Sequence, residues 1–254
     1  MHKPTICFVV CFVSIAGLCY AQDTVEFEGR YWLAGLDAKA KAVESNIGST
    51  FDLDSDLGIK DEDYPEGIVT WHINSDHRVR AAFTQAAYRG SRTITQSIDF
   101  NGKTYMAGAL IDSDLDLYYF RLGWIWQFIR FSNERVKLGT LLEGKGVFAD
   151  TALKAPNLVP ALSESEEYLV GLPTAGLALN IQPFTRMDLY AEGAGMSGGD
   201  YGYFIEAEAG AKILPTEHLS VTVGYRYLDV KAKNEDDFLK MKISGFFAGA
   251  TIRF

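Results

Sequence analysis

Three aspartates at a spacing of two are the side chains of this sequence best suited to ligand chemistry: Asp52, Asp54 and Asp56. This spacing aligns side chains on one face of an extended backbone, and carboxylate oxygens are ligands that Ca²⁺ and Mg²⁺ prefer. The calcium-loop pattern has Gly directly after the third acid, whereas Leu57 separates Asp56 from Gly58 here. We therefore predict a solvated acidic segment, with weak Ca²⁺ binding at these aspartates as the alternative. A second triplet has the same spacing and the same two interpretations: Asp112, Asp114 and Asp116.

Nucleophilic and acid–base candidates are few. All three cysteines lie within the first 21 residues: Cys7, Cys11 and Cys19. Thiol catalysis, disulfides and cysteine-ligated metals are therefore excluded for the rest of the chain. Three histidines follow that segment, and each lies at or beside a turn signal: His72, His77 and His218. We interpret them as ordinary polar residues of turns.

The N-terminal segment, residues 1–21, has the features of a secretory signal peptide. An apolar run from Ile6 to Tyr20 follows Lys3 and ends at Ala21, with small residues at the two cleavage-site positions. The run is about 15 residues long, whereas a membrane-spanning helix needs about 20. Leu18 precedes Cys19, which argues against a lipoprotein signal. We predict an exported chain with cleavage near Ala21, followed by one domain over residues 22–254.

Composition excludes several classes of protein. A mean hydropathy of -0.01 with 22% charged residues excludes a helical membrane bundle. Aromatic residues make up 13% of the chain, which argues against disorder. A net charge of -9 argues against nucleic acid as a partner.

The secondary structure that holds these residues is predicted to be β-strand, because hydrophobic residues alternate with polar ones almost throughout the chain after Asp23. Ten strands are predicted, at 25–33, 68–73, 78–84, 116–128, 136–145, 169–181, 187–192, 203–213, 221–227 and 246–254. Short turns near residues 75, 133, 184 and 216 alternate with mostly longer connections at 43–66, 89–109, 150–167, 197–202 and 231–238. Short turns on one rim and long loops on the other are typical of bacterial outer-membrane barrels.

The whole chain after the signal peptide resembles a small bacterial outer-membrane β-barrel of the OmpA/OmpX kind. The most specific feature is Phe254 with apolar residues at every second preceding position, Ile252, Ala250, Ala248 and Phe246. This ending is similar to the C-terminal signal by which the outer-membrane assembly machinery recognises such proteins. The resemblance implies an all-β, up-and-down transmembrane barrel in contact with membrane lipid and lipopolysaccharide. We expect about ten strands, with eight as the alternative.

The polar face of the predicted strands carries seven acids and nine bases. The central ones are Glu26, Glu28, Arg30, Arg80, Arg121, Glu143, Lys145, Glu192, Glu206, Glu208 and Arg226, with Arg78, Lys137, Asp188, Lys212 and Arg253 beside them. This set is too balanced for an ion-selective pore, and buried charges must pair. We predict a charge-paired, largely filled lumen, with a narrow gated pore for small solutes as the alternative.

Enzymatic activity is not expected. Omptin-type proteases, which are also ten-stranded, have a ring of acidic residues and a histidine at the outer rim of the barrel. The three histidines of this sequence are instead expected at the periplasmic rim. We therefore expect a structural or surface-interaction role without a cofactor, and a surface hydrolase is a further alternative. The acidic segment at 52–56 then lies at the outer rim, where a divalent ion could be shared with lipopolysaccharide phosphates.

Two further features bear on the barrel surface. Asn101-Gly102, flanked by Ile98 and Tyr105, is a strong hairpin signal and predicts that the third and fourth strands continue past the membrane as a ribbon, the most plausible binding surface. Aromatic residues near strand ends fit interfacial girdles: Trp124, Trp126, Phe128, Tyr225 and Tyr227.

Overall fold

The structure is a computed structural model that describes residues 24–44, 47–52, 62–95, 97–100, 103–158, 161–234 and 237–254. The predicted signal peptide lies outside the described residues. Among those residues, no helix is long and apolar enough to cross a membrane.

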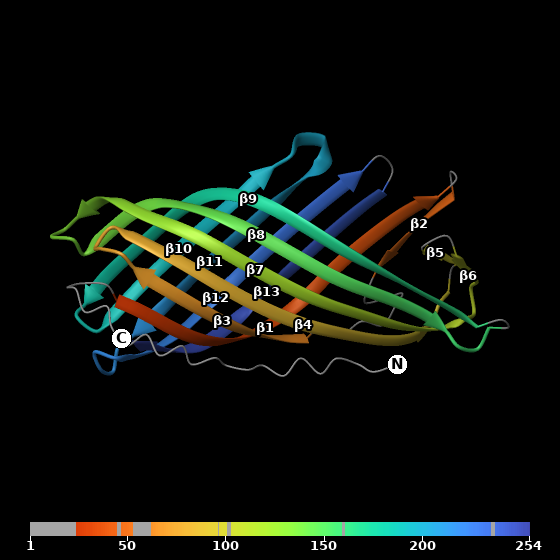
Figure 1. Ribbon diagram of the computed structural model, residues 1–254, viewed down its shortest axis with the longest axis horizontal. Coiled ribbons are helices and arrows are strands. Elements are labelled where there is room, and N and C mark those ends of the chain that lie inside the picture. The colour runs from red at the N-terminus through yellow and green to blue at the C-terminus, as the bar shows by residue number, and fades with distance from the viewer. Residues whose placement is uncertain are drawn as a thin grey trace.

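Ten antiparallel strands form a closed barrel in up-and-down order (Figure 1). The wall strands are β1 (Thr24–Glu44), β3 (Glu62–His72), β4 (His77–Thr93), β7 (Leu110–Phe131), β8 (Val136–Ala155), β9 (Leu162–Phe184), β10 (Met187–Ser197), β11 (Gly202–Ile213), β12 (Leu219–Asn234) and β13 (Asp237–Arg253). Pairing of β1 with β13 along sixteen residue pairs closes the barrel. The all-β fold and the ten-strand prediction are confirmed, and the eight-strand alternative is wrong.

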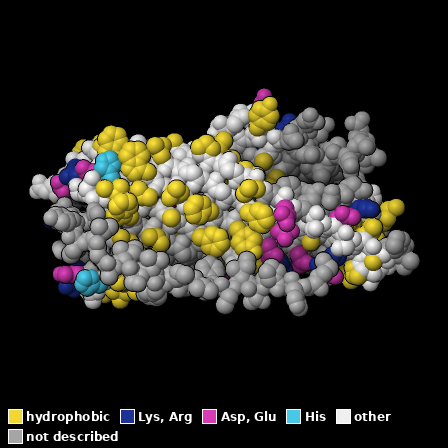
Figure 2. Space-filling view, in the orientation of Figure 1, with side chains coloured by type: hydrophobic (Ala, Val, Ile, Leu, Met, Phe, Trp, Pro, Cys, Tyr) yellow, Lys and Arg dark blue, Asp and Glu magenta, His cyan; other side chains and the backbone are white. Residues whose placement is uncertain are grey.

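Alternation along each strand gives the wall an apolar outer face and a mostly polar inner face. The outer face includes large exposed side chains such as Phe27, Leu122, Trp124, Val223 and Phe246, which are 40–69% exposed. Figure 2 shows hydrophobic side chains spread along the visible wall and charged ones gathered toward the two ends.

One end of the barrel has short turns. Asn74 caps the turn between β3 and β4, because its side-chain oxygen accepts hydrogen bonds from the backbone N–H groups of Asp76 and His77 at 2.9 Å each. At the same end, Val25 and Phe254 exchange backbone hydrogen bonds at 3.2 and 3.0 Å. The predicted short-turn rim therefore exists.

At the other end, several predicted loops are strands. β8 continues to Ala155 and β9 begins at Leu162, within the predicted loop 150–167. β12 continues to Asn234 and β13 begins at Asp237, which leaves little of the predicted loop 231–238. A 3-10 turn, η1 (Gly199–Tyr201), joins β10 to β11. The sequence analysis places the end of each strand where the outward-facing residues become polar. In the structure, the pairing between strands continues beyond the apolar band of the outer face.

Beyond that band the wall divides into two groups of strands. Pairing of β3 with β4 ends at Glu66 and Thr84, and pairing of β9 with β10 ends at Ala175 and Gly195. One group is β4, β7, β8 and β9; the other contains β12, β13, β1 and the short β2 (Ile47–Asp52), which pairs with the far half of β1. Figure 1 shows the two groups diverging, with β5 (Ile98–Phe100) and β6 (Lys103–Tyr105) between their ends.

The expected ribbon is confirmed in one part and wrong in another. The third and fourth strands, β4 and β7, stay paired beyond the apolar band to Thr93 and Leu110, as predicted. The β5–β6 hairpin, whose Asn101 and Gly102 lie outside the described residues, is a separate two-stranded sheet that contacts β1, β2 and β9, and not a continuation of those strands. Ile98 and Tyr105 face each other across the hairpin and are 1% and 0% exposed. Their shared apolar face explains why the hairpin packs against the barrel mouth and does not project as a free ribbon.

Candidate functional site: a charge network inside the barrel

The inner face of the barrel carries a connected network of charged side chains. The structure places on this face all eleven central charges named from the sequence: Glu26, Glu28, Arg30, Arg80, Arg121, Glu143, Lys145, Glu192, Glu206, Glu208 and Arg226. Each of them takes part in at least one ion pair within the barrel.

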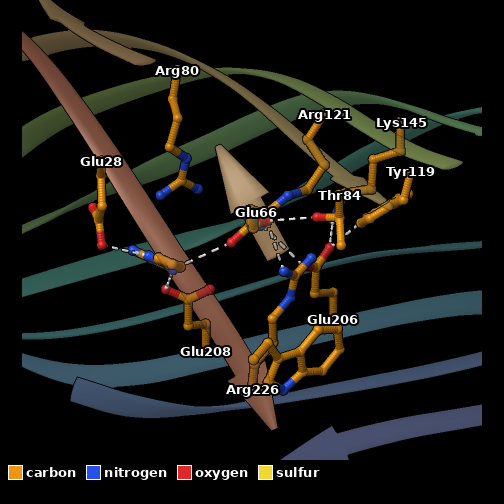
Figure 3. Close-up of polar contacts among 12 residues, drawn as sticks. Glu28, Glu66, Arg80, Thr84, Tyr119, Arg121, Lys145, Glu206, Glu208 and Arg226 are labelled. Atoms are coloured by element: carbon orange, nitrogen blue, oxygen red, sulfur yellow. Dashed lines mark hydrogen bonds and ion pairs between the residues drawn. The ribbon is translucent and has the colours of Figure 1, made fainter. Parts of the chain in front are cut away.

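Glu66, on β3, lies at the centre of the network (Figure 3). Its Oε1 accepts hydrogen bonds from Arg121 Nη2 at 2.6 Å and Arg226 Nη1 at 2.9 Å, and the Thr84 hydroxyl donates to it at 3.0 Å. Arg30 Nη1 lies 3.9 Å from the other carboxylate oxygen. A single carboxylate therefore meets cationic side chains from three strands, β1, β7 and β12.

Glu206, on β11, is the second centre. It pairs with Arg121 Nη1 at 3.0 Å and with Arg226 Nη2 at 2.5 Å. Lys145 Nζ also contacts it, and the Tyr119 hydroxyl donates to it at 2.8 Å. Arg121 and Arg226 thus link Glu66 and Glu206 into one cluster.

Two branches extend from this cluster. Arg80 pairs with Glu192 at 2.6 Å and with Glu143 at 3.4 Å. On the other branch, Arg30 pairs with Glu208 at 2.6 Å and with Glu28 at 2.5 Å. Since buried unpaired charge is costly, the close balance of acids and bases is what allows so many ionised groups to occupy the interior.

A separate group of charged side chains surrounds Glu26 at the short-turn end of the barrel. Its carboxylate pairs with Lys212 at 2.7 Å and accepts hydrogen bonds from Arg253 Nε and Nη2 at 2.8 and 2.5 Å. His72 Nε2 lies 3.4 Å from the same carboxylate.

Aromatic rings cover the network on the side of the long loops. The Arg226 guanidinium lies 4.6 Å from the centroid of Trp32, and that of Arg30 lies 4.6 Å from Phe247. Lys145 Nζ lies 4.9 Å from the ring of Phe204. These rings belong to a buried apolar cluster that continues to the β5–β6 hairpin.

The hairpin is held to this cluster by Tyr105. Its hydroxyl donates a hydrogen bond of 3.0 Å to the carbonyl oxygen of Leu153 on β8. Burial raises the pKa of the Tyr105 hydroxyl above its ordinary value, so the donor stays protonated.

A small cavity lies beside the charges. It is lined by Arg80, Arg121, Leu141, Glu143, Lys145, Glu192 and their neighbours, and it has room for about one water molecule.

Glu66 is the one central residue that sequence reasoning missed. The predicted strand began at Ile68, after Pro65 and Gly67, and assigned Glu66 to a loop. The inner-face alternation of Ile68, Thr70 and His72, extended back by two residues, would have placed Glu66 inside the barrel.

The three histidines lie at the short-turn end, apart from the central cluster. The ring of His77 stacks on Trp124 and Trp126 on the outer face, at centroid distances of 5.6 and 5.9 Å. His218 Nδ1 lies 3.3 Å from the backbone oxygen of Arg253.

The acidic triplets have different outcomes. Asp54 and Asp56 lie outside the described residues, as does the side chain of Asp52, the last residue of β2. In the second triplet, Asp114 pairs with Arg89 at 3.1 Å and Lys154 at 2.8 Å, and Asp116 pairs with Arg89 at 2.7 Å. Asp112 accepts a hydrogen bond from Ser91 at 2.6 Å. Within the described part of the chain, no group of three or more His, Cys, Asp and Glu side chains is placed to hold a metal ion.

Comparison with known proteins supports the fold. No family model matches the chain, and no curated protein matches its sequence. The outer-membrane protease OmpT from Escherichia coli has a similar structure, with a TM-score of 0.61, 8% identity, and coverage of 94% of this chain and 99% of that one. The translocator domain of the autotransporter NalP from Neisseria meningitidis has a TM-score of 0.50 at 13% identity and covers 93% of this chain and 90% of that one. At these identities the likeness is one of fold: the chain has the architecture of small outer-membrane β-barrel proteins.

Proposed function

We propose that this chain is an integral outer-membrane β-barrel whose lumen is closed to solutes and whose role is structural or carried out by its outer surface. A cleaved signal peptide would export it, leaving Gln22 as the first residue of the mature chain. The mass of the purified protein tests that cleavage.

Membrane insertion is supported by the apolar band on the outer wall. Its exposed side chains would be unfavourable in water over so wide an area but match the hydrocarbon of a bilayer. Trp71, Trp124 and Trp126 are 40–45% exposed and lie toward the short-turn end, where interfacial aromatic residues are expected.

The observation that carries the closed-lumen proposal is that the ion pairs cross the barrel. Arg80 on β4 reaches Glu192 on β10, and Arg121 on β7 reaches Glu206 on β11; in both pairs the strands are four places apart in the sheet order. Such bridges fill the cross-section and do not follow the wall. The aromatic cluster and the hairpin add a second obstruction above them.

A non-enzymatic role is part of the proposal. The central carboxylates are engaged by arginine and lysine, which leaves them poorly suited to act as general bases. The described histidines lie at the short-turn rim, away from substrates outside the cell.

The test is a bilayer measurement on refolded protein. Slower or faster migration of the unboiled sample on an SDS gel, relative to the boiled one, first establishes a folded barrel. We expect no steady conductance from the parent in planar bilayers, and channels only when Arg121→Ala or Glu143→Ala opens the network. A steady conductance in the parent that rises in these variants would support the narrow gated pore instead. Hydrolysis of lipid A or peptide by the parent would contradict the non-enzymatic part.

A further inference from the structure

One edge of β9 has no partner strand at the long-loop end, among the residues that the structure describes. Pairing of β9 with β10 ends at Ala175 and Gly195, whereas pairing of β9 with β8 continues to Leu162. β9 therefore follows β8 toward that end of the barrel while β10 diverges from it (Figure 1). We define the free edge as the side of residues 163–171 that faces away from β8.

The backbone groups that point out of the free edge can be identified from the β8–β9 ladder. The N–H of Gln182 donates a hydrogen bond of 2.7 Å to the carbonyl oxygen of Arg135, and the pairing with β8 continues without a register shift to Leu162. Even-numbered residues of β9 therefore bond to β8, and odd-numbered residues direct their N–H and C=O groups away from it. All five odd-numbered residues of the free edge are exposed: Ser163, Ser165, Glu167, Leu169 and Gly171.

Pro173 explains why the pairing with β10 stops where it does. It is the next odd-numbered residue after Ala175, so the position of its missing N–H lies on the β10 side. The ladder with β8 is unaffected, and Gly144 still pairs with Pro173 there. Beyond Pro173 the N–H donors resume at Gly171. The free edge can therefore accept another strand although β10 has left it.

The side chains along the free edge indicate what such a strand would contain. Toward the apolar band, Leu169 is 79% exposed and Val170 is 46% exposed. Farther out, all charged residues of β9 are acidic: Glu164, Glu166 and Glu167. Glu167 lies opposite Asp150 on β8, and a cationic side chain opposite its other side would form a favourable cross-strand pair. A strand antiparallel to β9 thus suits this edge when apolar residues precede lysine or arginine.

A second copy of the chain does not fit the free edge. Two barrels in one membrane have the same orientation, so their β9 strands both run from the long-loop end toward the short-turn end. A two-fold axis along the membrane normal would cross the tilted strands at roughly 80°, which prevents an antiparallel ladder between them. A separate peptide segment has no such constraint.

We infer that the free edge of β9 binds an extended basic segment of another polypeptide by strand addition. The main-chain groups of the odd-numbered residues supply the hydrogen bonds, and Leu169 and Glu167 select apolar and basic side chains along the added strand. This partner class deepens the surface role proposed above, and the inference rests on that role.

The test uses a fluorescent synthetic peptide of about nine residues, the length of the free edge, with valine and threonine in its N-terminal half and lysine in its C-terminal half. Fluorescence anisotropy measures its affinity for the refolded full chain in phosphatidylcholine bilayers. Leu169→Pro and Leu169→Ala both remove the leucine side chain, but only proline removes the N–H group. We expect Leu169→Pro to bind at least about five-fold more weakly than Leu169→Ala.

The charge preference is tested separately. Glu167→Gln should weaken binding of the lysine peptide by about two- to five-fold, and added salt should reduce this difference. A peptide with glutamate in place of lysine should bind the parent more weakly than the lysine peptide. Equal affinities of the two peptides would overturn the assignment of a basic partner.

The remaining outcomes separate the inference from the proposed function. Equal affinities of Leu169→Pro and Leu169→Ala overturn strand addition, as does equal binding of the peptide to bilayers without protein. Self-association of the parent that is lost in Leu169→Pro, measured by sedimentation, would make a second copy the occupant and overturn the inference. If Leu169→Pro does not refold, Ser165→Pro against Ser165→Ala gives the same comparison. Steady conductance of a parent that binds the peptide overturns the closed lumen alone, and a parent without the heat-dependent gel shift overturns both proposals.

Discussion

Arg226 Nη1 lies 2.9 Å from Glu66 Oε1, although 160 residues separate the two along the chain. Both side chains are almost completely buried, with side-chain exposures of 1% and 2%. The contact joins β12 to β3 across the two intervening strands, β13 and β1. Buried pairs of this kind owe their stability to mutual neutralisation, so the loss of one partner is costly.

Replacement of Glu66 by alanine should therefore destabilise the barrel strongly. It leaves Arg121 and Arg226 competing for Glu206 alone, with excess positive charge in a buried site. We expect a loss of about 3–5 kcal/mol in the free energy of unfolding. Urea titration of refolded protein, scored by the heat-dependent gel shift, measures it. Glu167→Ala, at an exposed position, is the control, and equal losses in the two variants would contradict a central role for Glu66.

The sequence predicts the barrel well because the alternation of outward and inward side chains along a strand can be recognised whatever the register between strands. Side-chain alternation at residues such as Trp124 and Trp126 marks the outer face without knowledge of which strands pair. The central network is harder to predict, since it depends on which inner residues meet across the lumen. Arg80 and Glu192 are 112 residues apart, and no local pattern links them. The alternation therefore indicates that charges face inward, while the choice of partners depends on closure of the barrel.

Strand ends were predicted poorly for a related reason. Beyond the apolar band, the outer face of β12 and β13 becomes charged and resembles a loop in composition. The antiparallel pairing of the two strands still continues there, for example at Lys231 and Lys240, which lie opposite each other. The residues on the outer face of a strand indicate whether that face contacts lipid or water. The length of the strand depends instead on the neighbouring strand with which it pairs.

Gly245 should not tolerate a side chain. A Cβ built there collides with the carbonyl oxygen of Leu33 on β1. Gly245→Ala should cost about 1–3 kcal/mol, because the two strands must separate at the seam that closes the barrel. Gly144, where an added Cβ meets nothing within 4 Å, is the matched control. Gly144→Ala should be neutral or stabilising by up to about 1 kcal/mol, and equal urea midpoints for the two variants would refute the steric argument.

The anchoring of the β5–β6 hairpin predicts a change in proteolysis. Tyr105→Phe removes the hydrogen bond to Leu153 while keeping the buried ring, at a cost of about 1 kcal/mol. Local opening of the hairpin should then speed trypsin cleavage after the exposed Lys103 by about five-fold. Met106→Ala changes a neighbouring side chain that is 62% exposed, and it should leave the rate unchanged. Identical cleavage rates for parent and Tyr105→Phe would show that the hydroxyl does not hold the hairpin.

Tryptophan fluorescence offers a direct measure of how the barrel sits in a bilayer. Trp71, Trp124 and Trp126 are 45%, 40% and 42% exposed on the outer face, whereas Trp32 is 3% exposed inside the lumen. Lipids brominated along their acyl chains quench only rings that they can approach. Variants that retain one tryptophan, with the others changed to phenylalanine, should therefore show strong quenching for the three outer residues and little for Trp32. Quenching should be strongest with bromine close to the headgroup, since the outer three lie toward the short-turn end, where the hydrocarbon meets the interface. Unquenched outer tryptophans in a refolded, heat-shifting barrel would place the apolar band outside the bilayer and contradict the proposed orientation.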